Sequence, residues 1–359
     1  MGKITFGIIG GGWRAEFYLR IAKELPEQFA VSRIFIRDEQ KARAMEQCWN
    51  VRTVSSFEEF VAQVDYSFAI VSVTWEANPQ LIIDLSNLGI PVLAETPPAP
   101  DLEGLIKLNR SIGKGAKVEV AEQYLFQPMH TARIALARSH KLGNISQVQV
   151  SVAHGYHGVS LIRQYLGIGY EEATISGLRF VSPLIQGPNR QGLPRSEVQI
   201  NSIQQLATFQ FGDRLGVFDF TSDQYFSWIR KNRILVRGDR GEILDQEVSY
   251  LEDYRTPMYS ELRRVDTGHN GNLEGYYHRG VQFSGEWLYQ NPFIPGRLSD
   301  DEIAIATCLY KMGQYVAGEG PSFYSLAEAS QDHYLSILMK EAVETGQNVN
   351  SVRQPWTLE

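Results

Sequence analysis

The chain has 359 residues, of which 43% are apolar and 21% charged, and its formal net charge is −7. This length exceeds what one ordinary hydrophobic core organises, so we expect two domains. The acidic balance argues against a nucleic-acid partner and against an anionic membrane surface. No apolar run is long enough to span a bilayer, and Cys48 and Cys308, the only cysteines, lie far apart in sequence. We therefore predict a reduced, cytoplasmic protein without a structural disulfide.

The first segment, Ile4–Ile9, is a short apolar run that ends in three glycines and is followed by a helical pattern. Gly10, Gly12 and Ala15 match G-x-G-x-x-G/A in that context. Gly10 can take tight-turn dihedrals, Gly12 lets a pyrophosphate approach the backbone, and Ala15 lets the helix pack close to the strand. The order of strand, glycine turn and helix predicts dinucleotide binding by Gly10, Gly11, Gly12, Trp13 and Arg14. The alternative is a structural turn that binds nothing.

Up to residue 122, strand-like and helix-like segments alternate. This alternation predicts a parallel sheet covered by helices on both faces, which is a Rossmann-type dinucleotide-binding domain over residues 1–122. The expected strands are Ile4–Ile9, Val31–Ile36, Phe68–Val73, Pro91–Glu95 and Lys117–Ala121, and the expected helices are Arg14–Leu25, Glu39–Gln47, Pro79–Leu88 and Leu102–Ile112.

From residue 123 to residue 359 the pattern is different. One more helix is expected at Met129–His140, and strand-like segments then succeed one another without intervening helices. Such succession predicts an open, largely antiparallel sheet in an α+β domain. Capping boxes that begin at Ser299 and Ser325 predict two closing helices. The expected strands are Ser146–Ala153, Gln204–Phe211, Leu215–Thr221 and Arg233–Gly238, and the closing helices are Ile303–Val316 and Ala329–Val343.

This α/β organisation resembles the glucose–fructose oxidoreductase/inositol dehydrogenase/MocA (Gfo/Idh/MocA) family. The resemblance spans essentially the whole chain and rests on four motifs: Gly7–Gly12, Ala94-Glu-Thr-Pro97, Val120-Ala-Glu-Gln-Tyr124, and His154-Gly-Tyr-His157 leading to Arg163–Gly167. It implies an NAD(P)-dependent oxidoreductase that acts on a sugar, a cyclitol or a related hydroxy or keto compound. It also implies that the second domain holds this small-molecule substrate and forms a homo-oligomer, a dimer or tetramer, through its sheet.

Two polar groups that the family pattern implies are missing from the expected catalytic site. The family has a lysine in Glu-Lys-Pro, whereas this chain has Thr96, whose hydroxyl can hydrogen-bond but carries no charge near neutral pH. The family's aspartate, four residues before the catalytic residue, is Ala153 here. His157 remains as the candidate acid/base, because an unperturbed imidazole has a pKa of about 6.5. His154 and Tyr156 are further catalytic candidates, the alternatives being a helix cap and core packing. No third ligand lies at zinc spacing, so we predict no metal.

The end of the second strand bears on the choice of nucleotide. The position that usually carries a carboxylate is Ile36, followed by Arg37 and Asp38. Arg37, together with Arg14, favours the 2′-phosphate of NADP, whereas Asp38 is the ribose ligand if the strand is one register longer. We expect NADP or NAD, with a slight preference for NADP.

Four further positions are assigned to cofactor binding. Thr74 and Trp75 follow the third strand segment, and the Trp75 ring either covers the nicotinamide or packs its loop. Glu95 and Gln123 match family positions beside the nicotinamide ribose and carboxamide. The segment Gly268–Phe293 is rich in aromatic and amide side chains, which suit either a sugar or a subunit interface.

Two other functions stay open at this stage. In one of them, the cofactor oxidises a substrate transiently, so that a lyase or hydrolase reaction proceeds without net redox change. The missing lysine and aspartate also suit a catalytically silent member that binds a nucleotide or a sugar. Three results distinguish these functions. Net NAD(P)H production indicates the oxidoreductase, product formation without net NAD(P)H indicates the lyase or hydrolase, and binding without turnover indicates the silent member.

Overall fold

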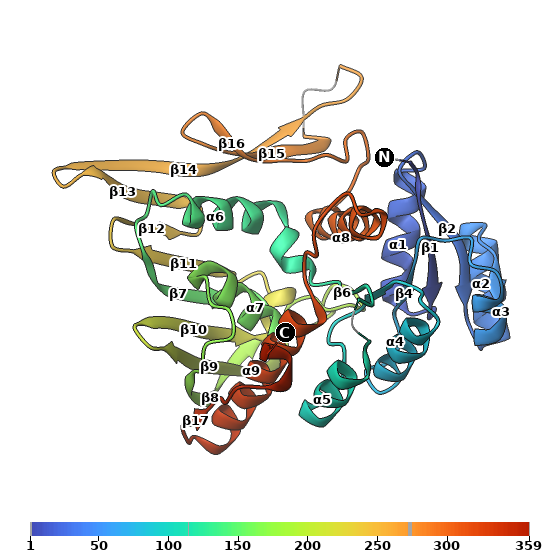
Figure 1. Ribbon diagram of the computed structural model, residues 1–359. Coiled ribbons are helices and arrows are strands. Elements are labelled where there is room, and N and C mark those ends of the chain that lie inside the picture. Colours follow the sequence, from blue (N-terminus) through green and yellow to red (C-terminus); the bar gives the residue numbers. More distant parts are fainter. Residues whose placement is uncertain (1, 114, 272–274, 359) are drawn as a thin grey trace.

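The computed structural model describes residues 2–113, 115–271 and 275–358, and it contains two sheets with helices between them (Figure 1). The N-terminal sheet has six parallel strands in the order β3-β2-β1-β4-β5-β6. This confirms the predicted Rossmann-type fold. Its strands are β1 (Ile4–Ile9), β2 (Phe29–Phe35), β3 (Thr53–Val54), β4 (Phe68–Val71), β5 (Val92–Ala94) and β6 (Val118–Val120), and its helices are α1 (Trp13–Glu24), α2 (Glu39–Trp49), α3 (Phe57–Ala62), α4 (Asn78–Asn87) and α5 (Leu102–Ser111).

Three strands of this sheet are buried along their whole length because helices cover both faces. Every residue of β4, β5 and β6 is buried. The strand order reverses between β1 and β4, which places a crevice at the carboxyl ends of these two strands. Neither β3 nor α3 was predicted, because a two-residue strand carries no measurable periodicity.

The second sheet has eleven strands in the order β16-β15-β14-β13-β12-β11-β7-β10-β9-β8-β17. Neighbouring strands are antiparallel except for β7 and β10, which confirms the predicted open, largely antiparallel sheet. Its strands are β7 (Ile145–Ser151), β8 (Thr174–Ile185), β9 (Gln199–Phe211), β10 (Arg214–Thr221), β11 (Arg233–Gly238), β12 (Gly241–Leu244), β13 (Glu247–Asp253), β14 (Thr256–Thr267), β15 (Tyr277–Phe283), β16 (Glu286–Gln290) and β17 (Val349–Asn350).

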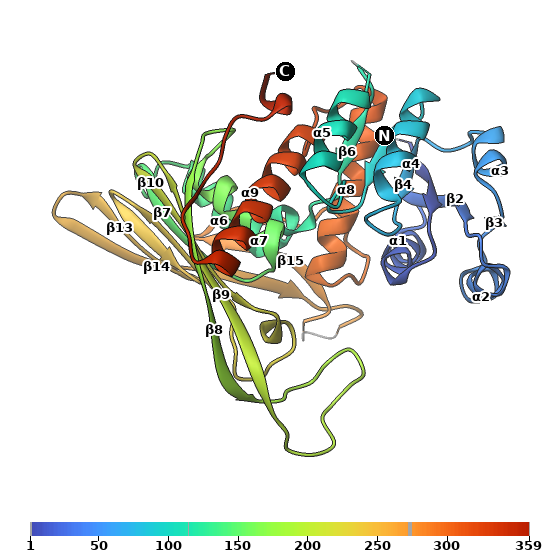
Figure 2. The same cartoon turned by 90° about the horizontal axis from the view of Figure 1, so that it is seen from below.

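The remaining helices connect the two sheets. Figure 2 shows α6 (Pro128–Arg138), α7 (Gly155–Leu166) and α9 (Leu326–Thr345) on the face of the large sheet that looks toward the Rossmann domain, while the other face is uncovered. Short 3₁₀ helices lie at η1 (Gln123–Phe126), η2 (Ser222–Tyr225) and η3 (Pro355–Leu358). None of the described helices is both long and apolar enough to cross a membrane.

The two closing helices begin where the capping boxes predict. Ser299 caps α8 (Asp300–Ala317) and Ser325 caps α9, each with the reciprocal glutamate contact. Although α8 comes late in sequence, it packs on α1 and β1, and its Ile303 and Leu309 share a buried cluster with Phe6. The C-terminal part of the chain thus completes the core beneath the glycine turn.

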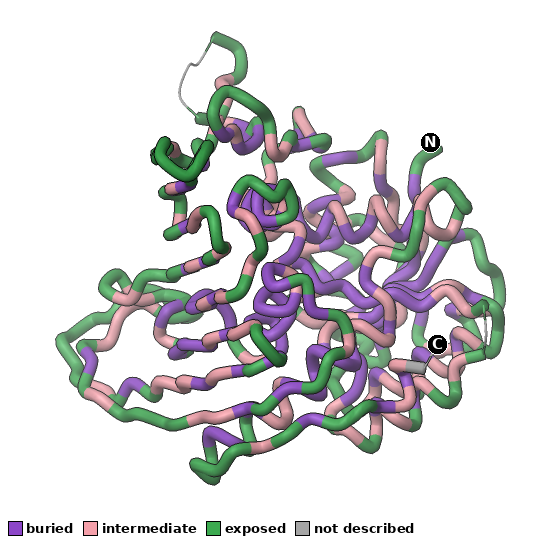
Figure 3. Tube along the Cα trace, turned by 60° about the vertical axis from the view of Figure 1, so that its left-hand side comes forward, coloured by how far each residue is buried: buried purple, intermediate pink, exposed green. Residues whose placement is uncertain are grey.

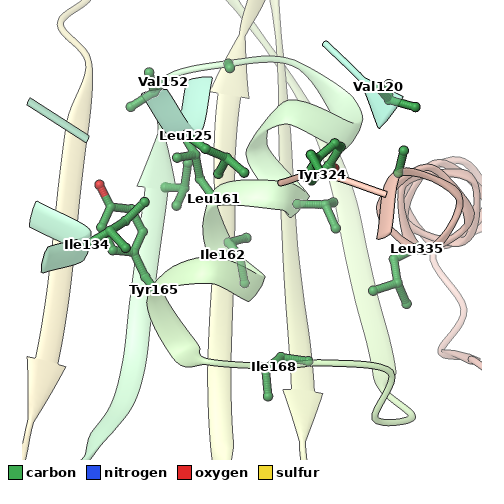
Figure 4. Close-up of a cluster of buried hydrophobic side chains, with 14 of the residues drawn as sticks. Val120, Leu125, Ile134, Val152, Leu161, Ile162, Tyr165, Ile168, Tyr324 and Leu335 are labelled. Atoms are coloured by element: carbon green, nitrogen blue, oxygen red, sulfur yellow. The ribbon is translucent and has the colours of Figure 1, made fainter. Parts of the chain in front are cut away.

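A second core cluster joins the Rossmann sheet to the helices of the large sheet. In Figure 4, Val120 of β6, Leu125 of η1, Leu161 of α7 and Leu335 of α9 meet in one region. Figure 3 shows the same pattern for the whole chain, with buried segments running through the junction and exposed segments at the sheet margin. This junction holds the start of α7 near the carboxyl edge of the Rossmann sheet.

Candidate active site

A cavity of about 810 Å³ lies at the carboxyl ends of β1, β2 and β4. Gly10 has φ +110°, and a Cβ there would lie 2.0 Å from the carbonyl oxygen of Ser72. A Cβ on Gly12 would have no neighbour within 4 Å, so the start of α1 is open to a ligand. This cradle of backbone N–H groups fits the pyrophosphate of a dinucleotide. The predicted residues that line it are Gly10, Gly11, Gly12, Trp13, Arg14, Arg37, Asp38 and Thr74.

The charged residues that follow β2, at one end of this cavity, have different hydrogen-bond partners. The carboxylate of Asp38 accepts a hydrogen bond from the Lys41 backbone N–H at 3.0 Å and thereby caps α2. Arg37 and Lys41 line the same cavity. Ile36, at the position where a ribose-binding carboxylate usually lies, packs its Cδ1 beneath Gly11.

Replacement of Gly10 or Gly12 by alanine should have different effects: the first should destabilise the fold, and the second should weaken nucleotide binding. We expect Gly10→Ala to lower the free energy of unfolding by at least about 3 kcal/mol, because the new methyl group overlaps the backbone of Ser72 at a positive φ. Gly12→Ala should change that free energy by less than about 1 kcal/mol, since its φ of −74° suits any residue. It should nevertheless weaken NADH binding at least about tenfold, because the methyl group projects toward the pyrophosphate. Urea unfolding and calorimetric titration measure the two effects, and unimpaired NADH binding by Gly12→Ala would contradict the assignment.

A second cavity, of about 520 Å³, adjoins the first and shares Trp13, Arg14, Ser72 and Val73 with it. It is bounded by the glycine turn, the end of β5, η1, and the start of α7. The structure places all the other predicted site residues in its wall, namely Trp75, Glu95, Thr96, Gln123, His154, Tyr156 and His157. Sequence reasoning did not identify six other residues of the wall, namely Tyr124, Gln127, Arg190, Tyr225, Phe226 and Asp301.

His157 is held between a carboxylate and a phenol. Its Nδ1 lies 2.7 Å from Oε2 of Glu122, and its Nε2 lies 3.1 Å from the hydroxyl of Tyr156. Burial raises the pKa of Glu122 to about 8 and lowers the pKa of His157 to about 3, so charge on either group is disfavoured. Burial also raises the pKa of Tyr156, which keeps its hydroxyl protonated. The three groups form a hydrogen-bonded relay that ends in the wall of the cavity.

Thr96 lies at the cavity end of this relay. Its side chain hydrogen-bonds to Tyr156 and so opposes part of the rise in the pKa of the phenol. The family's lysine position is thus filled by the uncharged hydroxyl of Thr96, which contacts the phenol of Tyr156. Glu122 supplies the carboxylate that Ala153 cannot, and it comes from the loop after β6 instead of the start of α7.

His154 belongs to a different hydrogen-bonded group. It is the N-cap residue of α7, but its side chain makes no capping hydrogen bond. Its Nδ1 lies 2.5 Å from the hydroxyl of Tyr225, which also bonds to Tyr124. Desolvation by the surrounding protein, with a smaller contribution from His157, lowers the pKa of His154 to about 4. A neutral imidazole therefore faces the cavity beside the relay.

Arg14 occupies the boundary between the two cavities. Its Nε lies 3.4 Å from Glu95 and its Nη1 lies 3.6 Å from Asp301 of α8. The hydroxyl of Tyr18 donates to Glu95 at 2.5 Å. Burial opposes the charge on Arg14, but the two carboxylates outweigh it and raise its pKa. Arg14 therefore forms ion pairs with neighbouring acids, and it lines both cavities.

None of the described residues of the predicted aromatic and amide segment lines either cavity. At the β14–β15 hairpin, His269 stacks on Tyr276, and Tyr277 meets both rings edge-on. Residues 272–274 of that segment lie outside the described residues. Within the described ranges, no group of three or more His, Cys, Asp or Glu side chains is arranged to hold a metal ion.

Glu122 is the principal functional residue that sequence reasoning missed. A signal existed, because Glu122 follows the buried strand β6, which pairs in parallel with β5. Carboxyl ends of neighbouring parallel strands meet at one edge, so Glu122 was placed to reach the residues after β5. Asp301 and Arg190 carried no such signal, since each reaches the cavity from a separate part of the second domain.

The comparisons with known proteins agree with this geometry. Residues 4–121 match the family model GFO_IDH_MocA, described as an oxidoreductase family with an NAD-binding Rossmann fold. Comparison with curated protein sequences gives no match. Over nearly its whole length, however, the chain is similar in fold to solved oxidoreductase structures.

Three of these structures illustrate the likeness. Levoglucosan dehydrogenase in complex with NADH and levoglucosan is 15% identical, with a TM-score of 0.70 over 98% of this chain and 100% of that chain. An oxidoreductase from Agrobacterium radiobacter in complex with NAD⁺, L-tartaric acid and magnesium is 15% identical, with a TM-score of 0.68 over 97% and 98%. The WlbA dehydrogenase from Chromobacterium violaceum in complex with NADH and UDP-GlcNAcA is 15% identical, with a TM-score of 0.64 over 98% and 97%.

These identities are low, and the likeness therefore concerns the fold. The match of residues 4–121 is independent of it and confirms the resemblance that the motifs indicated. Residues 4–121 thus match the NAD-binding Rossmann fold of the Gfo/Idh/MocA oxidoreductase family, and the fold of nearly the whole chain is similar to that of solved oxidoreductases.

Proposed function

We propose that the protein is an NAD(P)-dependent oxidoreductase that interconverts a hydroxyl and a keto group on a sugar, a cyclitol or a related compound. The observation that carries this proposal is the pair of adjoining cavities. One is shaped for a dinucleotide, and the other ends in the relay of Tyr156, His157 and Glu122. The shared residues Trp13 and Arg14 mark where the nicotinamide end of a bound cofactor would meet the substrate.

The residues of the relay would move the proton of this reaction. In oxidation, the substrate hydroxyl gives its proton to the Tyr156 oxygen while Tyr156 passes its own proton to Nε2 of His157. Ionised Glu122 stabilises the imidazolium that forms, at the 2.7 Å contact with Nδ1. A nicotinamide cofactor, held at the glycine turn beside Trp13 and Arg14, would supply the hydride acceptor for this oxidation. Thr96 contributes a hydrogen bond to the phenol and no proton transfer of its own.

The composition of the second cavity supports a carbohydrate-like substrate. Trp13, Trp75, Tyr124, Tyr225 and Phe226 lie in its wall. Aromatic rings stack on the C–H faces of sugars, while neighbouring polar groups bind the hydroxyls. The similar structures named above were solved with levoglucosan, L-tartaric acid and UDP-GlcNAcA bound, which accords with a substrate of this class.

The nucleotide preference follows from the far end of the first cavity. Arg37 and Lys41 both line it, and Asp38, the one carboxylate among the described residues that line it, caps α2. Two cations favour a 2′-phosphate, whereas an occupied carboxylate is a poorer acceptor for ribose hydroxyls. We therefore propose a preference for NADP over NAD, which the arginine at residue 37 first suggested.

The exposed apolar side chains of the β8–β9 hairpin support self-association. Leu178, Phe180, Val181, Ile185 and Ile203 of the β8–β9 hairpin are each at least 40% exposed. Exposed apolar residues in such number on neighbouring strands are typical of protein interfaces. We propose that this sheet forms the contact of a homo-dimer or homo-tetramer.

Calorimetric titration and a turnover assay test the proposed function together. Nucleotide-stripped protein is titrated with NADPH and NADH, then incubated with NADP⁺ or NAD⁺ and a panel of sugars and cyclitols. We expect NADPH to bind more tightly than NADH, and reduced cofactor to accumulate with at least one polyol. Product formation without net reduced cofactor would favour a lyase or hydrolase instead. Nucleotide binding without any turnover would favour a silent member.

A further inference from the structure

The long β8–β9 hairpin brings a positive charge to the wall of the second cavity. Figure 2 shows this hairpin extending well beyond the rest of the large sheet. Arg190 lies in the connection between its strands, and its guanidinium carbon is 4.6 Å from the centre of the Trp13 ring. Because Trp13 begins α1, this contact seats the hairpin tip on the nucleotide-binding domain at the mouth of the cavity.

A second guanidinium lies on the same indole. The Arg14 guanidinium carbon is 5.0 Å from the Trp13 ring centre, so one ring holds two cations at the cavity wall. Nη1 of Arg14 is buried and has no hydrogen-bond partner, because Asp301 lies too far away at 3.6 Å. Among the residues that the structure describes, none forms an ion pair or a side-chain hydrogen bond with the Arg190 guanidinium.

The buried Nη1 of Arg14 has no acceptor among the described residues, and the exposed Arg190 side chain lies against the same Trp13 ring. Guanidinium groups bind carboxylates and phosphates through paired N–H donors, and a buried donor without an acceptor costs free energy. The acids in the wall, Glu95 and Asp301, already face Arg14, so neither is available to Arg190. An anionic group between the two arginines would satisfy the unpartnered Nη1 and neutralise the charge of Arg190.

We propose that the substrate of this site carries a carboxylate or phosphate group, which Arg190 and Arg14 bind beside the relay. The proposal rests on the proposed function and narrows its substrate class to sugar acids or sugar phosphates. The cofactor's own phosphates are a poorer candidate, because Arg190 lines the second cavity and not the nucleotide cavity. The hairpin then serves as a specificity element, which reaches from the second domain to the acidic end of the substrate.

Matched pairs of ligands test the proposal. The full-length protein, saturated with NADPH or NADH, is titrated calorimetrically with D-glucuronate, D-gluconate and D-glucose 6-phosphate, and with their neutral partners D-glucose and D-glucitol. We expect at least one acid to bind about tenfold or more tightly than its neutral partner. Arg190→Ala should remove this difference, while Arg195→Ala, an exposed arginine of the same connection outside both cavities, should keep it. Nucleotide affinity should be the same in all three proteins.

Two results would overturn the proposal. One is binding of acids no tighter than binding of neutral partners, including no binding of either kind. The other is a loss of NADPH or NADH affinity in Arg190→Ala, which would assign Arg190 to a cofactor phosphate. The proposed function fails by a different result, because acid binding that depends on Arg190 but occurs without any turnover would leave the anion site intact and remove the oxidoreductase activity.

Discussion

Replacing Glu122 with glutamine is expected to lower the rate of hydroxyl oxidation by about 10³- to 10⁴-fold, although the two side chains have nearly the same shape. In the protein as it is, Oε1 of Glu122 accepts a hydrogen bond from the Tyr124 backbone N–H at 3.2 Å. Its other oxygen, Oε2, contacts Nδ1 of His157. An ionised Glu122 accepts a hydrogen bond from the Nδ1–H of His157, which leaves Nε2 free to take the proton of Tyr156.

Glutamine reverses this arrangement. Its amide oxygen must occupy the Oε1 position, because only an acceptor can face the Tyr124 N–H. The NH₂ group then donates to Nδ1 of His157, which forces the remaining imidazole proton onto Nε2. That nitrogen can no longer accept from Tyr156, so the base is lost although every side chain stays in place. His157→Ala should abolish turnover by removing the acceptor altogether, with NADPH and NADH affinity nearly unchanged.

The pH dependence separates this chemical role from a structural one. Burial raises the pKa of Glu122 to about 8, so near neutral pH its carboxyl group is mostly protonated. The protonated carboxyl donates to Nδ1 of His157, which leaves the imidazole proton on Nε2 and prevents that nitrogen from accepting the proton of Tyr156. We expect kcat for oxidation to rise as the pH increases through about 8, where the Glu122–His157 pair loses one proton. The glutamine variant should lack this rise. Measurement of kcat and KM from pH 6 to 9.5 for both proteins decides the matter, and a wild-type pH profile in Glu122→Gln would exclude Glu122 from the relay.

The Rossmann domain was largely predictable because its signals are local. The glycine turn, the buried strands and the intervening amphipathic helices each fall within one short window of sequence. Asp38, by contrast, was weighed as a ribose ligand, and its contact with the Lys41 backbone N–H makes it a helix cap. Both roles suit an aspartate just before a helix, so residue type and position alone do not distinguish them.

The margin of the large sheet was not predictable for the opposite reason. Strand β14 is exposed at eight of its twelve positions, and β8 has exposed residues on both faces of its middle. Alternation between apolar and polar residues arises only when one face of a strand is buried. Strands such as β10, which pack beneath α7, carry apolar residues and were predicted close to their observed bounds.

The candidate site was predictable only where its residues are neighbours in sequence. His154, Tyr156 and His157 lie within one turn, and the structure brings all three to the cavity wall. The groups that set their protonation come from elsewhere. Glu122 belongs to the loop after β6, and Asp301 belongs to the first turn of α8. No spacing rule connects such positions, because their proximity depends on how the two sheets join.

The helix that carries His157 is fixed at its other end by a buried ion pair, and breaking this pair should unfold the protein more readily than any surface change. Arg163 of α7 lies 2.6 Å from Asp332 of α9, with side chains only 3% and 1% exposed. The hydroxyl of Tyr324 also donates to Asp332, and Arg163 donates to the carbonyl oxygen of Gly169. Arg163 is thus a buried ion-pair partner that joins α7 to α9.

We expect Arg163→Ala to lower the free energy of unfolding by about 3–5 kcal/mol at pH 7.5, because it leaves the Asp332 carboxylate buried without its counter-ion. Arg237→Ala is the matched control. It removes an ion pair with Glu242 at 2.8 Å whose side chains are 48% and 39% exposed, and it should cost about 1 kcal/mol or less. Urea unfolding followed by circular dichroism measures both losses. Equal losses in the two variants would contradict the role of burial.

The loss in Arg163→Ala should also depend on pH in a stated direction. Burial already raises the pKa of Asp332 while Arg163 opposes that rise, so removing the arginine raises the folded-state pKa further above the unfolded value of about 3.9. A carboxyl with a raised folded-state pKa is protonated at little cost at low pH, and its destabilising effect grows as the pH increases through that pKa. The difference between Arg163→Ala and the wild type should therefore be smaller at pH 5 than at pH 7.5. A difference that stays constant or grows toward pH 5 would mean that Asp332 does not remain buried once its partner is gone.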